Sequence, residues 1–316
     1  MRVKLYGTRG STPGQPRGSH RYGGNTTCLR IISDCIPADT GFAVDAGSGF
    51  FDLSKDLLKE GTRKIATVFT HWHHDHSQGL CLAPHTFIGD SFTIWGPQEH
   101  SVGPRQVLQR IFAPPLFPVP FAEVAHRFKF KSLESIGTQV LVIHPVGGFA
   151  LLPVNTFRAL ETTHEQIAFR SGRFDIKECM IVRMHKTVHP EYTISYRFEE
   201  RPTGRVFVFL TDQEKQSASP ASLRRHLAEA DLLVMDAQYA EARYLETAGF
   251  GHGTPEYCVQ TAIDAHVGRL GLTHHDPNAT DDDIDMRLAE ALAYAKERMG
   301  APNSIFACAD YMELDV

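Results

Sequence analysis

The sequence lacks any apolar run long enough to cross a membrane, since no segment approaches the roughly 20 apolar residues that a spanning helix needs. Its first seven residues also lack the long apolar stretch of a secretory signal peptide. The six cysteines are scattered, and none forms a Cys-x-x-Cys pair, so we expect buried thiols in a reducing compartment. These absences favour a cytoplasmic protein with no membrane partner.

A strong positive charge is lacking as well. The formal net charge is −5, so we expect no strong electrostatic attraction to nucleic acids or anionic membranes. With 42% hydrophobic residues, the 316-residue chain can bury a sizeable core. The abundant residue is histidine, the commonest metal ligand in proteins, which occurs 17 times.

The predicted elements form a β-rich first half, followed by strands that alternate with helices. Apolar and β-branched runs predict strands at 3–7, 26–33, 41–45, 64–70, 92–96, 139–144, 179–186, 192–198, 205–211, 232–236 and 269–273. Helices are predicted at 50–60, 220–230, 254–266 and 281–299, with Thr254 and Thr280 as N-caps and Pro255 at a first helical position. This order indicates an α/β (α+β) fold, with two packed sheets and helices outside.

Residues 97–130 differ in character, because prolines alternate there with phenylalanines. Such a stretch cannot form one regular element. We interpret it as a lobe over one face of the core, and a packed surface loop is an equally good alternative.

A group of potential metal ligands follows the predicted strand 64–70. His71, His73 and His76 fall within six residues, and Asp75 lies among them. Imidazole and carboxylate groups are the ligands that suit zinc and related divalent ions. A tight turn after a strand can direct these side chains toward one point, so the pattern predicts a metal site.

This pattern, His71-x-His73-x-Asp75-His76, resembles the signature of the metallo-β-lactamase superfamily. The segments 22–28 (Tyr-Gly-Gly-Asn-Thr-Thr-Cys) and 45–49 (Asp-Ala-Gly-Ser-Gly) are similar to its phosphodiesterase-like branch, which includes tRNase Z and the PhnP-like enzymes. The resemblance covers essentially the whole chain. It implies one αββα four-layer domain over 1–316, with inserted lobes at about 97–130 and 146–175. It also implies two divalent metal ions, with zinc expected and manganese or iron as alternatives.

The resemblance further implies which residues bind the metals. His71 and His73 would bind the first ion, and Asp75 and His76 the second. Asp212, at the end of strand 205–211, would bridge both ions.

Two ligand positions stay open. His189 would complete the first metal site, because the segment that follows resembles the branch pattern, and His164 is the alternative. Only one of His274 and His275 can be well aimed, because neighbouring strand residues point to opposite faces. The resemblance of Leu-Thr-His at 272–274 to the family pattern favours His274 as the ligand that completes the second site, with His275 as the alternative.

Two adjacent metal ions can hold a bridging hydroxide, which could attack phosphodiesters, β-lactams or thioesters. His252 stands just before the helix that begins after Thr254, where free N–H groups favour an anion. The resemblance implies that His252 contacts the scissile phosphate and protonates the leaving oxygen, and that Asp236 orients it. Asp75 is expected to contribute to catalysis as well as to metal binding.

These features favour a phosphodiesterase that acts on a small or cyclic phosphodiester. A tRNA 3′-end endonuclease would need a nucleic-acid partner and is disfavoured by the acidic charge. A thioesterase- or lactamase-like hydrolase is a third hypothesis, and a non-catalytic binding protein is a fourth. The oligomeric state is left open, a homodimer being one option.

Overall fold

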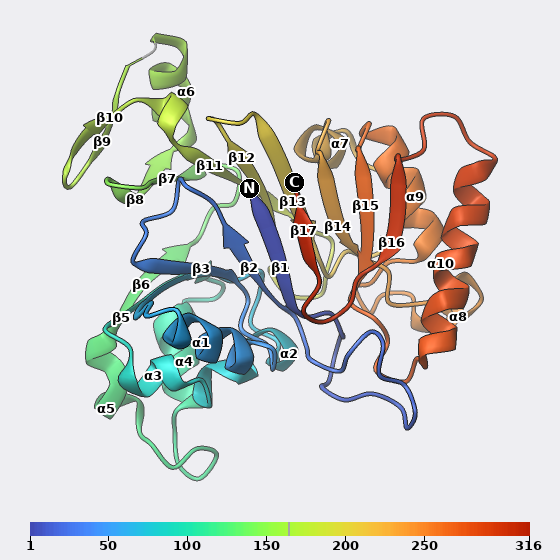
Figure 1. The fold of residues 1–316 in the computed structure, drawn as a ribbon, viewed down its shortest axis with the longest axis horizontal. Helices are drawn as coiled ribbons and strands as arrows, with labels where there is room; N and C mark the ends of the chain where they lie inside the picture. Colours follow the sequence, from blue (N-terminus) through green and yellow to red (C-terminus); the bar gives the residue numbers. More distant parts are fainter. Residues whose placement is uncertain (164) are drawn as a thin grey trace.

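The computed structural model describes residues 1–163 and 165–316, in which two β-sheets pack face to face (Figure 1). The first sheet has seven strands in the order β17-β1-β2-β3-β4-β5-β6. Its strands are β1 (Arg2–Gly7), β2 (Cys28–Ile32), β3 (Thr40–Val44), β4 (Lys64–Val68), β5 (Ser91–Pro97), β6 (Phe128–Leu133) and β17 (Glu313–Asp315).

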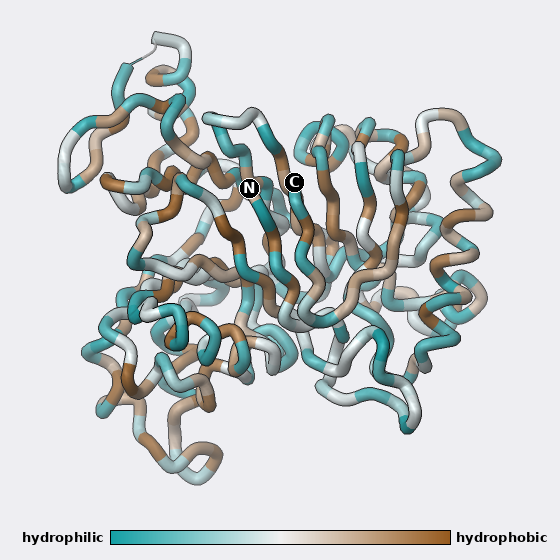
Figure 2. Tube along the Cα trace, viewed as in Figure 1, coloured by the Kyte–Doolittle hydropathy of each residue, from teal (hydrophilic) through white to brown (hydrophobic). Residues whose placement is uncertain are grey.

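The second sheet has eight strands in the order β16-β15-β14-β13-β12-β11-β7-β8. They are β7 (Gln139–His144), β8 (Gly148–Pro153), β11 (Met180–Lys186), β12 (Ile194–Glu200), β13 (Arg205–Leu210), β14 (Leu232–Asp236), β15 (Arg269–Thr273) and β16 (Ser304–Ala307). A separate hairpin joins β9 (Ile167–Phe169) to β10 (Gly172–Phe174). Hydrophobic residues recur along the strands of the eight-stranded sheet (Figure 2).

The main core lies between the sheets and follows the two-residue period of the strands. Val3 and Leu5 of β1 belong to the same buried cluster as Phe207 and Phe209 of the other sheet. Intervening residues point outward, as Ile65 of β4 does. Since alternate residues face opposite sides of a sheet, each strand can bury both faces once helices cover the outside.

Helices cover both outer faces, which confirms the predicted four-layer αββα sandwich. Those over the first sheet are α1 (Phe50–Lys59), α3 (Pro84–Ile88), α4 (Pro104–Ile111) and α5 (Phe121–Val124). Those over the second are α7 (Ala221–Leu227), α9 (Pro255–Asp264) and α10 (Asp281–Lys296), and α6 (Val154–Thr163) packs near its far edge. The remaining short helices are α2 (His74–Ser77), η1 (Gln78–Cys81), η2 (Ala125–Arg127), η3 (Ile176–Glu178) and α8 (Glu241–Thr247).

The predicted N-caps are confirmed. Thr254 accepts a hydrogen bond from the backbone N–H of Tyr257, and Pro255 opens α9. Thr280 and Asp283 form a reciprocal capping box at the start of α10. Both helices end two to three residues before the predicted ends.

The segment 97–130 is more ordered than its composition suggests. It contains α4 and α5, and its last residues, which include Phe128 and Phe130, belong to β6, which pairs with β5. Phe112 and Phe121 are buried against the outer face of the first sheet. The segment is thus part of the outer helical layer on that side.

In the segment 146–175, β8 extends the second sheet as its edge strand, and α6 buries Phe157 against Val140 and Ile181. The division of the chain into one domain with two insertions stays a prediction. His164, the alternative metal ligand, lies outside the described residues.

All six cysteines are buried with free thiols, as expected. Within residues 1–163 and 165–316, no helix combines the length and the apolar character needed to cross a bilayer.

Candidate metal centre

The residues singled out from the sequence lie at or just beyond the ends of strands, with Asp75 and His76 in the short helix α2 and Asp236 as the last residue of β14. His71 follows β4 after two residues, and His189 follows β11. The parallel strands β13, β14 and β15 bring Asp212, Asp236 and His274 to one edge of the second sheet, because neighbouring parallel strands end on the same side. The two sheets thus contribute to a single site.

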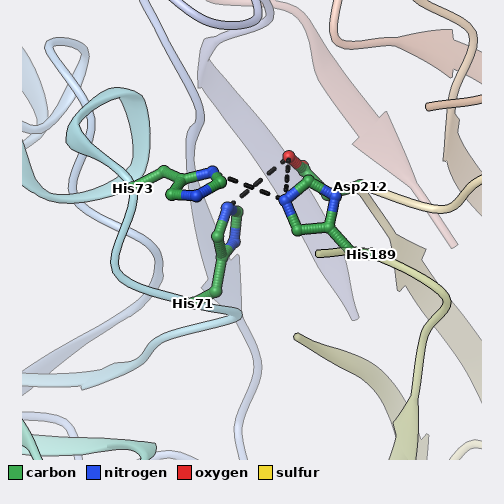
Figure 3. Close-up of side chains that lie close together, drawn as sticks. All are labelled: His71, His73, His189 and Asp212. Atoms are coloured by element: carbon green, nitrogen blue, oxygen red, sulfur yellow. Dashed lines mark hydrogen bonds and ion pairs between the residues drawn. The ribbon is translucent and has the colours of Figure 1, made fainter. Parts of the chain in front are cut away.

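A first donor set consists of His71, His73, His189 and Asp212, whose nearest ligand atoms all lie within 4.8 Å of one another. The four side chains point toward one another, with His71 and His73 on one loop and His189 and Asp212 on two others (Figure 3). Nε2 of His189 lies 3.4 Å from Nδ1 of His73 and 3.8 Å from Oδ2 of Asp212. Nε2 of His71 lies 3.6 Å from the same carboxylate oxygen.

The imidazoles of this set have nitrogens free to bind a cation. Nε2 of His71 is buried and has no hydrogen-bond partner among residues 1–163 and 165–316. Nδ1 of His189 lies 3.1 Å from the carbonyl oxygen of Gly251, which can only accept, so Nε2 carries the free lone pair. Burial lowers the pKa of both histidines, which favours the neutral form that metals require.

A second donor set consists of Asp75, His76 and His274, also within 4.8 Å of one another. Nε2 of His274 lies 3.3 Å from Oδ2 of Asp75 and 3.3 Å from Nε2 of His76. Burial opposes charge here, yet the carboxylates of Asp75, Asp212 and Asp45 raise the pKa of His76 well above its usual value. This concentration of buried negative charge fits a bound cation.

Asp212 lies between the two sets. Its Oδ1 is 3.3 Å from Nε2 of His76 and 3.4 Å from Nε2 of His274. Its Oδ2 faces His71 and His189 of the first set. Although burial opposes ionisation, the surrounding imidazoles hold the pKa of Asp212 well below its usual range. One ionised carboxylate therefore faces both sets, as a bridging ligand must.

Further residues, to which the sequence assigned no role, hold the ligands in place. Oδ2 of Asp45 lies 2.8 Å from Nδ1 of His76, and Oε1 of Gln238 lies 2.7 Å from Nδ1 of His274. Such partners select the tautomer that leaves Nε2 free. Asp45 belongs to the 45–49 segment noted in the sequence, whereas nothing in the sequence pointed to Gln238.

His252 lies above the second set and faces it. Its Nδ1 is 2.9 Å from Oδ2 of Asp236, and its ring stacks on His274 with centroids 5.0 Å apart. Burial would lower its pKa, but the Asp236 carboxylate and the more distant Asp212 and Asp75 raise it to about 9. The pair Asp236–His252 thus keeps a protonated imidazole at the site.

His274 and its neighbour His275 lie in different surroundings. His275 is buried, and its Nε2 lies 2.8 Å from the carbonyl oxygen of Cys308. Its ring packs edge-on against Tyr22. The geometry thus brings His274, and not His275, to the second donor set. It likewise brings His189 to the first donor set.

A cavity of about 660 Å³ opens over both sets and is lined by residues that include Asp75, His189, Asp212 and His252. Its volume lies within the roughly 300–1,000 Å³ of small-molecule sites. Buried candidate donors, the carboxylate of Asp212 that faces both sets, and the Asp236-bound His252 thus border one accessible space.

Comparisons with known proteins agree with this arrangement. Residues 40–275 match the family model of the β-lactamase superfamily domain. Ribonuclease Z of Bacillus subtilis (strain 168) is 26% identical over 273 residues, which are 80% of this chain and 82% of that protein. The short form of human tRNase Z shares the fold with a TM-score of 0.59 and 18% identity, covering 100% of this chain and 99% of that one. Zn²⁺-bound PqqB from Methylobacterium extorquens has a TM-score of 0.60 and 14% identity, covering 100% of both chains. The chain therefore belongs to the metallo-β-lactamase superfamily.

Proposed function

We propose that this protein is a dinuclear metal-dependent phosphodiesterase that acts on a small or cyclic phosphodiester. The observation that carries the proposal is the position of His252, which faces the donor sets while Asp236 holds its Nδ1. A proton donor at this place suits a reaction whose leaving group is an alkoxide.

The donor sets fit two divalent cations. His71, His73 and His189 would hold the first, and Asp75, His76 and His274 the second, with Asp212 shared between them. Bound there, two such cations would activate a water and offset the negative charge that develops on the phosphoryl group. We propose zinc, and mixed imidazole and carboxylate sets also accept manganese or iron.

His252 has the properties of a general acid. Its Nδ1 hydrogen is shared with Asp236, so the proton on Nε2 is the one available to the substrate. When the bond between phosphorus and the leaving oxygen breaks, this proton passes to that oxygen and the leaving group departs as an alcohol. Asp236 acts through His252 by orienting the ring, and Asp75 lines the same cavity as a ligand.

A second candidate function, cleavage at the 3′ end of tRNA, is favoured by the relatives that carry the name Ribonuclease Z. The net charge of −5 weighs against a large polyanionic partner. The position of His252 disfavours the thioesterase- or lactamase-like alternative, which does not need this acid.

A substrate panel tests the proposal. Protein loaded with zinc would be assayed against bis(p-nitrophenyl) phosphate, cyclic nucleotides, precursor tRNA and a chromogenic β-lactam. We expect turnover of the small phosphodiesters and none of the lactam. Efficient cleavage of precursor tRNA alone would replace the small-substrate proposal with the second candidate, and hydrolysis of the lactam alone would contradict both.

A further inference from the structure

A second cavity, of about 410 Å³, adjoins the site on the side of the first donor set. We call it the side pocket, and it lies between the loop 71–77, the turn 99–102, helix α4 and the residues Glu191 and Tyr192. In Figure 1, α4 lies on the same side of the molecule as α2, which carries part of that loop. None of the residues proposed for the second metal lines this pocket.

The side pocket adjoins the cavity over the donor sets. Both are lined by Trp72, His73, His74 and Glu191. A molecule whose phosphate lies over the donor sets can therefore extend a second group past His73 into the side pocket.

The aromatic walls of the side pocket are held firmly. The indole N–H of Trp72 donates to the carbonyl oxygen of Pro97 at 2.8 Å, and its ring stacks on Phe69 at 4.5 Å between centroids. The hydroxyl of Tyr192 accepts from the backbone N–H of Ile136 at 3.1 Å. Rigid aromatic faces favour a planar ligand, because little side-chain freedom is lost when it binds.

The rim of the pocket is also ordered. His100 and Ser101 both have left-handed backbone angles, with φ of 49° and 64°, in a turn closed by hydrogen bonds between Glu99 and Val102. A carboxylate oxygen of Glu99 lies 3.4 Å from the backbone nitrogen of Tyr192, which links the turn to the opposite wall. Positive φ at both central residues is the geometry of a two-residue hairpin turn, which fixes this part of the rim.

Arg110 supplies a solvent-exposed positive charge at the wall of the pocket. Among the described residues its guanidinium has neither a hydrogen bond nor an ion pair, and it lines the pocket beside the apolar Val107 and Ile111. Arg105, one turn earlier on α4, instead lies over the ring of Phe121 and takes no part in the pocket. An unpaired arginine beside aromatic walls can stack on a ring or donate to its acceptors.

We infer that the side pocket binds the heterocyclic base of a nucleoside phosphodiester, an inference that rests on the proposed phosphodiesterase function. Apolar and aromatic walls would contact the faces of the base, while Arg110, Glu99 and Glu191 would meet its polar edge. An aliphatic chain would fill the same volume but would offer Arg110 neither a ring to stack on nor an acceptor to donate to. We therefore expect the side pocket to favour phosphodiesters that carry a heterocyclic base over those that carry an aliphatic group.

The test compares two esters with the same leaving group. Zinc-loaded protein would hydrolyse thymidine 5′-(p-nitrophenyl phosphate) with a higher kcat/KM than methyl p-nitrophenyl phosphate. Arg110→Ala should lower kcat/KM for the thymidine ester about tenfold, the scale of one lost hydrogen bond to a charged group, and leave the methyl ester unchanged. Val107→Trp, which fills the pocket, should have the same selective effect, and Arg105→Ala is the matched control that alters neither.

Binding of thymidine 5′-monophosphate, measured by equilibrium dialysis, separates this inference from the proposed function. If no phosphodiester is hydrolysed, the proposed function fails, and weaker nucleotide binding by Arg110→Ala than by Arg105→Ala would still support the pocket. Equal hydrolysis of the two esters, with no selective effect of either pocket variant, would overturn the inference and leave the phosphodiesterase proposal intact.

Discussion

At the scale of single residues, the site depends on side chains held in unusual backbone conformations. Asp212 and His274 have positive φ angles of 51° and 60°, a region that residues other than glycine seldom adopt. Both are buried, and both direct their donor atoms toward the same point. The surrounding fold therefore maintains strained residues where we propose that metals bind.

The first prediction concerns His252. His252→Ala should keep both metals and fold normally, but lose about 10²–10⁴-fold in kcat on an alkyl phosphodiester, because an alkoxide needs a proton to leave. The same variant should lose much less on a p-nitrophenyl ester, whose leaving group is already stable as an anion. Steady-state kinetics on the two esters measure the contrast, and equal losses would remove His252 from the chemistry.

At the scale of elements, the loop between α8 and α9 supports the first donor set. Glu214 accepts hydrogen bonds from the backbone N–H groups of Gly249 at 3.1 Å and Gly251 at 2.6 Å. Both glycines have left-handed angles, with φ of 90° and 94°. A Cβ on Gly251 would lie 2.0 Å from Nδ1 of His189, whereas one on Gly249 would meet nothing within 4 Å.

This difference predicts distinct outcomes for two matched substitutions. Each should cost about 1 kcal/mol of stability, because alanine is strained at a positive φ. Gly251→Ala should in addition displace His189 and lower the bound metal from two ions toward one, whereas Gly249→Ala should keep two. Elemental analysis and thermal unfolding measure both effects, and retention of two metals by Gly251→Ala would argue against His189 as a ligand.

At the scale of the whole molecule, the candidate ligands come from both halves of the sandwich. His71, His73, Asp75 and His76 follow the first sheet, and His189, Asp212 and His274 follow the second. Cations bound by ligands from both sheets would link the two sheets at this edge. Metal binding should therefore stabilise the folded chain as a whole.

We expect about two metal ions per chain in protein purified without chelator. Removing them should lower the unfolding free energy by about 2.7 kcal/mol for each ion at a free-metal concentration of one hundred times Kd, and so lower Tm by several degrees. Calorimetry before and after dialysis against EDTA, followed by addition of zinc, measures this. A metal content near one, or an unchanged Tm, would contradict the dinuclear proposal.

The sequence alone determined the features that depend on local pattern. Period-two and helical spacing located β7, β14 and β15 to the residue, and the N-caps at Thr254 and Thr280 follow from local hydrogen bonding. The closely spaced histidines after β4 identified half of the candidate centre, because ligands near in sequence leave a recognisable motif. Edge strands such as β8, β16 and β17 were missed, since they are short and depend on pairing with distant strands.

Only the tertiary structure decided how residues far apart in sequence meet. Parallel pairing of β13, β14 and β15 places Asp212, Asp236 and His274 together, and the approach of Gly251 to His189 turns one imidazole nitrogen toward the donor set. His274 and His275 are adjacent and chemically identical, so no local rule separates them. Their tertiary surroundings distinguish them: His274 has a positive φ, and His275 lies beside the carbonyl oxygen of Cys308. Both features are imposed by packing against other parts of the chain.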